Sequence, residues 1–173
     1  AFFTDGTDNH ISAGNVGIGT SSPSGKLDVS NSTNGDLVVL RSTVAPTSTP
    51  TSIINSQYYY TGTTFTGGSQ IRFAKDNSTA GHYGHHLRFY TRANGSSVAE
   101  RVRITSGGAL LVGKTATGLA TVGTTLFDDG TAYHTVDGNV TMRLNRLTDD
   151  GTIIDLRKDG TTVGSIGTES SGL

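Results

Sequence analysis

Residues 86–105 read HLRFYTRANGSSVAERVRIT, and this stretch decides the fold. Apolar and polar side chains alternate through residues 86–92 and again through residues 99–105, which is the two-residue period of a β-strand. Between the two runs, the letters ANG at 93–95 have the composition of a tight turn. The stretch therefore predicts two strands joined by a short loop.

The same pattern continues on both sides of this stretch. The run QIRFAK at 70–75 alternates and ends at a DNS turn, and Asp-Gly pairs at 150–151 and 159–160 lie between apolar runs, as in β-hairpins. Strand-like runs are expected at residues 13–20, 26–30, 37–42, 53–65, 109–113, 119–127, 140–147, 152–158 and 162–166.

The composition favours strands over helices. Glu, Gln, Lys and Met, which are good helix formers, together number nine, whereas Gly, Ser and Thr make up 70 of the 173 residues. Only the short run at 116–120 has a composition that allows a helical turn. The sequence predicts an all-β protein built from short antiparallel strands and hairpins.

Charge and cysteine content narrow the partners. The net charge is -1 without a basic cluster, so we expect no nucleic-acid partner. No apolar stretch approaches the roughly 20 residues of a membrane span, so no membrane insertion is expected. There is no cysteine, so no disulfide is expected. No cofactor-binding motif is present, so no cofactor is predicted. With only 33% hydrophobic residues, a single copy has little core of its own, which favours assembly of several copies.

Turn-rich stretches suggest a division into three parts. We expect an N-terminal repeat segment at 1–36, a middle β-domain at 37–117 and a C-terminal β-domain at 118–173. The last part stops in mid-pattern and the first residue is Ala, so we interpret the chain as a truncated segment of a longer polypeptide.

Three segments resemble the distal tail-fibre and tailspike proteins of tailed bacteriophages. They are GNVGIGTSSPSGKLDVS at 14–30, LRFYTRANGSSVAERVRITSGGALLVGKT at 87–115, and LNRLTDDGTIIDLRKDGTTVGSIGT at 144–168. The last looks like the stretch that precedes an intramolecular chaperone of the endosialidase type in such proteins. No chaperone sequence lies within the 173 residues, so no self-cleaving residue is assigned here.

The resemblance implies small β-sandwich or β-prism units in an intertwined homotrimeric fibre. It also implies a structural protein, not an enzyme, that sits in the virion tail fibre and mediates or positions attachment to the host cell. Other virion tail proteins, and a host surface glycan, are the partners it implies, with assembly in the host bacterial cytoplasm. Glycines that alternate with Val, Ile or Leu, as at 16–19, suit chains that approach closely around an axis.

Two groups of residues are candidates for receptor contact. Tyr59 lies in a run of three tyrosines, where a strand would point it away from its neighbours and an exposed ring could stack on a sugar. The run GHYGHH carries His82, Tyr83, His85 and His86 beside two glycines, which predicts an exposed turn that touches a receptor. Three chains would also bring nine histidines together, which leaves a shared metal site as a less favoured alternative; the sequence predicts no metal.

Two other functions are compatible with the sequence. Asp128-Asp129, Asp149-Asp150 and Asp155 are carboxylates that a polysaccharide-degrading tailspike fragment would need in pairs. Both pairs precede a Gly in turn sequences, where Asp is expected to bond to its own backbone. A bacterial surface adhesin or filament is the third hypothesis, because such proteins also contain β-repeats.

Overall fold

The computed structural model describes residues 9–12, 14–30, 38, 40, 49, 51–61 and 64–169, with the backbone alone at 9–12, 59–61 and 64–65. The described part contains strands and turns and no helix, so the prediction of an all-β protein is confirmed. The strands are β1 (Asn9–Ser12), β2 (Asn15–Ile18), β3 (Leu27–Val29), β4 (Thr51–Thr61), β5 (Thr64–Lys75), β6 (His85–Arg92), β7 (Val98–Ile104), β8 (Leu110–Val112), β9 (Gly123–Leu126), β10 (Ala132–Thr135), β11 (Gly151–Lys158) and β12 (Thr161–Thr168).

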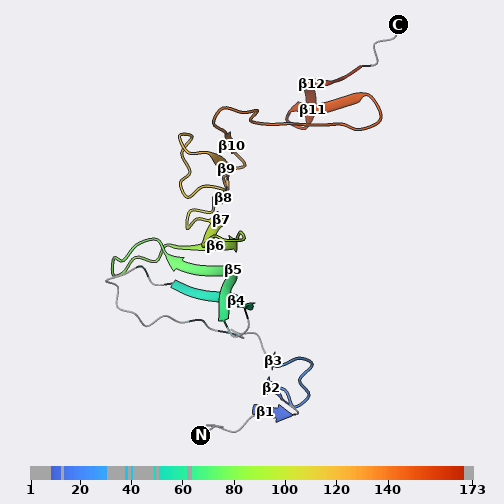
Figure 1. The fold of residues 1–173 in the computed structure, drawn as a ribbon. Helices are drawn as coiled ribbons and strands as arrows, with labels where there is room; N and C mark the ends of the chain where they lie inside the picture. The colour runs from blue at the N-terminus through green and yellow to red at the C-terminus, as the bar shows by residue number, and fades with distance from the viewer. Residues whose placement is uncertain are drawn as a thin grey trace.

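The strands form three open sheets, which follow one another in chain order in Figure 1. The first holds β1, β2 and β3, with β2 and β3 parallel. The second holds β4 to β10 in strict chain order with every neighbouring pair antiparallel. The third is the β11–β12 hairpin. Among the described elements, contacts between strands occur only within each sheet.

Two hairpins follow the turn signals of the sequence, but the hairpin expected at Asp150-Gly151 does not form, because residues 140–147 pair with no described strand. The turn between β6 and β7 places Gly95 at a φ of +73°, and the turn between β11 and β12 holds Asp159 and Gly160 at +50° and +77°. Left-handed backbone of this kind is the reason that Asp-Gly and Asn-Gly pairs favour hairpins. The β6–β7 and β11–β12 pairs were both expected from these signals.

The structure corrects several local expectations. Residues 140–147 alternate as a strand does, but they pair with no described strand, and within 119–127 only β9 forms. Alternation indicates a segment with two different faces; it does not supply the neighbour that a strand needs. Residues 116–120 form bends and turns rather than a helical turn. The strand expected at 37–42 lies outside the described residues apart from Val38 and Leu40.

The seven-stranded sheet continues across residue 117, where the sequence suggested a domain boundary. β8 and β9 lie on either side of that residue and pair through Leu110 with Leu126 and Leu111 with Thr125. The three-part division of the chain itself stays a prediction.

The seven-stranded sheet is one layer thick, and its two faces differ sharply. Directly paired residues of neighbouring strands lie on the same face of a sheet, so the register assigns each side chain. One face, the apolar face, is formed mainly by Ile54, Ile71, Phe73, Leu87, Phe89, Val102, Ile104, Leu110, Val112 and Leu126, with Ser52, Lys75, His85, Thr124 and His134 at its margins. The opposite one, the polar face, carries Gln70, Arg72, His86, Arg88, Tyr90, Glu100, Arg103, Leu111 and Thr125.

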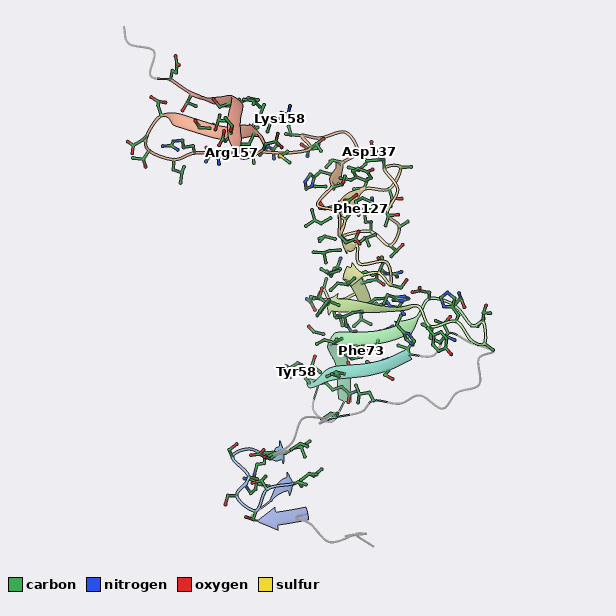
Figure 2. The ribbon with its side chains drawn as sticks, turned by 180° about the vertical axis from the view of Figure 1, so that it is seen from behind. Tyr58, Phe73, Phe127, Asp137, Arg157 and Lys158 are labelled. Carbon is green, nitrogen blue, oxygen red and sulfur yellow. The ribbon has the colours of Figure 1, made fainter. Side chains whose placement is uncertain are left out.

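The buried residues of this sheet lie on the polar face. Leu111 and Thr125 are fully buried, and Tyr90 is 8% exposed. On the apolar face, Ile54 is 53% exposed and Phe73 is 41% exposed. Long arginine side chains lie over the polar face and cover it, as such side chains do with their aliphatic stems. In Figure 2, Phe73 is labelled in the part of the seven-stranded sheet that holds β4 to β7.

Candidate functional site

A carboxylate at the centre of the polar face binds the side chains around it. Glu100 accepts hydrogen bonds from Arg103, Nε to Oε1 at 2.7 Å and Nη2 to Oε2 at 3.0 Å. The hydroxyl of Tyr90 donates to Glu100 Oε2 at 3.0 Å and accepts from Arg88 Nη1 at 3.1 Å. The Arg72 guanidinium lies 4.0 Å from the centre of the Tyr90 ring, a cation–π contact.

Charge and burial act against each other at Glu100. Burial alone would raise the pKa of Glu100, but hydrogen bonds from Arg103 and Tyr90 and the positive charges of Arg103 and Arg88 lower it below its ordinary value. The hydrogen bond to Glu100 raises the pKa of Arg103 in turn. The cluster is therefore ionised at neutral pH and fixes the polar face. Its arrangement is that of a structural ion network.

A β-bulge creates this cluster. Phe89 pairs with Val102 and Tyr90 with Glu100, so Arg101 is an extra residue in β7. Such a bulge shifts the following side chains to the other face. Without it, Glu100 would lie on the same face as Val102 instead of beside Tyr90.

The histidine run does not converge on one point. His86 is buried on the polar face, and its Nδ1 lies 2.8 Å from Asp76 Oδ1. Hydrogen bonds from His86 and from Ser106 lower the pKa of Asp76. His85 begins β6 on the other face, and its Nδ1 bonds to the carbonyl oxygen of Tyr83 at 2.7 Å.

The remaining members of that run lie in the loop before β6. Tyr83 is 90% exposed, and His82 Nδ1 accepts a hydrogen bond from the backbone N–H of Gly84 at 3.2 Å. Among the described residues, no group of three His, Cys, Asp or Glu side chains could hold a metal ion. The role of these residues in receptor contact stays a prediction, and Tyr83 is the member best placed to meet one.

A groove of about 400 Å³ lies where β4, the start of β5 and the β6–β7 turn meet. Tyr58 forms one wall, Gly67 and Gly68 form part of the lining, and Arg92 and Asn94 add polar groups. Arg92 donates through Nε to the carbonyl oxygen of Ser96 at 2.6 Å and through Nη1 to that of Gly67 at 3.2 Å. These bonds hold the guanidinium at the groove.

The sugar-stacking tyrosine expected from the sequence was Tyr59. Its backbone pairs with Phe65 in the β4–β5 ladder, and its side chain lies outside the described residues. Tyr58 is the neighbour whose ring the structure describes, and this ring is 69% exposed. A groove with an open aromatic ring and fixed polar groups is the kind of surface that a saccharide can stack on. Figure 2 labels Tyr58 at the β4 end of the sheet.

The aspartates make local contacts. Asp129 Oδ1 accepts from the backbone N–H of Thr131 at 2.8 Å, and this bond lowers the pKa of Asp129. Asp155 pairs with Arg157 on the exposed surface of β11 at 2.6 Å. Asp129 thus has the turn chemistry expected for it.

Within the described residues there is no helix of the length and apolarity that a membrane crossing requires. Comparisons of the chain with protein-family models, with curated proteins and with solved structures gave no match.

Proposed function

We propose that this chain is a structural segment of a phage tail fibre that assembles as a homotrimer and positions or mediates attachment to the host surface. The observation that carries the proposal is the open apolar face of the seven-stranded sheet. A contiguous face of this kind marks an interaction surface on a soluble protein. Because Ile, Leu, Val and Phe side chains make up most of this face, with Lys75 and His85 at its margin, an identical face is a complementary partner for it.

Three copies with their apolar faces turned inward would form a β-prism, with the polar faces outside. The exposed β11–β12 hairpin fits the same arrangement. It has Ile154 opposite Ile166 with Leu156 on the same face, and Ile166 is 59% exposed. An isolated two-stranded hairpin is marginal in water, so it gains stability from further strands or copies. The phage origin, the virion location and the other tail proteins as partners rest on the resemblance of the three segments.

Light scattering coupled to size-exclusion chromatography tests the proposal. We expect a species of about 54 kDa, three times the 17.9 kDa of one chain, which persists on dilution to nanomolar concentration because obligate interfaces are large. A particle of one chain mass at every concentration would refute the trimer, and a dimer would refute the prism.

Attachment makes a separate prediction at the groove. Replacement of Tyr58 by Ala removes the exposed ring, which we expect to weaken binding to host polysaccharide by about tenfold per site, the equivalent of about 1.4 kcal/mol. Because three sites act together, the loss of avidity is larger on a dense surface. The measurement is biolayer interferometry on immobilised polysaccharide from the host.

Tyr83→Ala is the matched control, since that ring is also highly exposed but lies in the loop before β6, outside the groove. Equal binding by the Tyr58→Ala variant and the unchanged chain would exclude the groove. A loss with Tyr83→Ala instead would favour the loop that the sequence singled out.

A further inference from the structure

Residues 140–147, with the sequence VTMRLNRL, pair with no strand that the structure describes. Val140, Met142 and Leu144 are each about half exposed, while Thr141, Arg143 and Asn145 alternate with them. From Val140 to Arg146, no backbone hydrogen bond to another described residue's backbone is present, and only the Val140 N–H has a side-chain acceptor, Asn139 Oδ1 at 2.7 Å. Backbone N–H and C=O groups that stay unpaired in a strand-like, half-apolar segment are a template for another strand.

The β10 edge of the seven-stranded sheet is a place where another strand can pair. β10 pairs with β9 on one side, and among the described strands nothing pairs with its other side. An added strand there would extend the sheet with the same two-faced character. Val140, Met142 and Leu144 would continue the apolar face, and Thr141, Arg143 and Asn145 would continue the polar face.

Charges favour the same pairing. The segment contains two positive side chains, Arg143 and Arg146, and no negative one. The loop between β9 and β10 carries Asp128 and Asp129, and Asp137 follows β10. The open edge therefore lies between acidic residues, and the segment that fits it is basic.

The link between β10 and the segment contains an Asp-Gly pair, a sequence typical of hairpin turns, but no hairpin forms there. Asp137 and Gly138 follow β10 after one residue, Val136, and Gly138 has a φ of +67°. This pair would return the chain onto its own β10 if the hairpin closed. Instead, the segment leads away from β10 toward β11 (Figure 1), and the sheet edge of the same copy stays open.

We propose that residues 140–147 of each copy pair as a strand with β10 of a neighbouring copy. Each copy carries this segment and an open β10 edge, so a closed ring of copies gives every such segment a β10 partner. Exchange of an element across a hinge is a low-cost route to an intertwined oligomer. This proposal rests on the homotrimer proposed above and names the element that the copies exchange.

Met142 is the single methionine of the chain and provides a unique probe. Photo-methionine is incorporated at this position, and chains with natural isotopes are co-refolded with ¹⁵N-labelled chains into mixed trimers. After irradiation, we expect covalent dimers and trimers, and peptides in which Met142 of a light chain is joined to residues 132–135 of a heavy chain. A Met142→Leu variant, irradiated in the same way, gives the background.

Each other outcome overturns the exchange. A trimer whose cross-links join Met142 only to its own chain means that the hairpin closes within one copy. Cross-links between chains that map outside 132–135 mean that the segment packs across the axis without pairing to β10. A trimer without cross-links above background means that the segment contacts no neighbour. In these three cases the homotrimer itself stands, whereas a monomer in light scattering overturns both proposals.

Amide hydrogen exchange gives a second readout on the unchanged protein. Paired backbone N–H groups at 140–147 should exchange about a hundredfold more slowly than those of an unstructured peptide. Exchange at the unstructured rate within a stable trimer also overturns the proposal.

Discussion

Phe73→Asp is expected to convert the trimer into monomers. Phe73 lies on the apolar face, directly between Ser52 of β4 and Leu87 of β6, and is 41% exposed in the single chain. The substitution removes about 2 kcal/mol of apolar burial per copy and places an unpaired carboxylate in the interface, which costs several more. A loss of about 4 kcal/mol per copy, about 12 kcal/mol for the trimer, raises the dissociation constant about a thousandfold for each copy. Sedimentation velocity at micromolar concentration measures the change.

Tyr83→Asp is the matched control for this variant, because it introduces the same charge in place of a 90% exposed aromatic ring away from the sheet. We expect it to remain a trimer. Far-ultraviolet circular dichroism of Phe73→Asp separates dissociation from unfolding. A folded Phe73→Asp protein that remains trimeric at micromolar concentration would show that the apolar face is not the interface.

Glu100→Ala should produce the largest loss of stability on the polar face. The side chains of Glu100 and Arg103 are 12% and 18% exposed, so the substitution leaves two largely buried guanidinium groups, of Arg88 and Arg103, without their carboxylate. Breaking a buried pair in this way costs about 3 kcal/mol. Urea denaturation of the assembled protein measures the loss.

The exposed pair on β11 provides the matched control. Asp155 and Arg157 form an ion pair of similar length, but their side chains are 35% and 60% exposed. Asp155→Ala should therefore cost less than about 1 kcal/mol. Equal effects of the two substitutions would contradict the burial argument.

The Glu100 variant also predicts a difference in acid sensitivity. Because the pKa of Glu100 is lowered in the folded protein, its contribution is fully present above the ordinary pKa of about 4.3 and is lost as the pH falls through the folded value. The unchanged protein should thus lose more stability between about pH 5 and 2 than the Glu100→Ala variant. Melting temperatures across this range measure the difference, and parallel curves would contradict it.

The sequence predicted strands and turns well where the signal is local to the segment. Alternation through 86–92 and 99–105 and the turn at Gly95 are local signals, and the structure confirms the β6–β7 hairpin that they predict. Residues 140–145 alternate as clearly and have no partner among the described strands, because pairing depends on a neighbour that the segment's own sequence does not specify. Local pattern therefore predicted which segments have two faces, and it could not predict which of them would pair.

The bulge at Arg101 shows why the candidate sites were harder to predict. Strict alternation places Glu100 with Val102, whereas the extra residue turns Glu100 toward Tyr90 and Arg103. The same limit applies to the histidine run, in which neighbours in sequence point to different environments. His86 is buried beside Asp76 while Tyr83 is open, and no pattern of glycines nearby distinguishes the two.

The strict chain order of the seven-stranded sheet determines how the length of the sheet can change. Neighbouring strands lie about 4.8 Å apart, so β4 to β10 advance the molecule by about 29 Å over six spacings. Every strand is joined to the next one along the ladder, with no crossover. Insertion of one hairpin would lengthen the sheet by about 10 Å and replace only the pairing at the point of insertion. Its length is therefore open to change in small, regular steps.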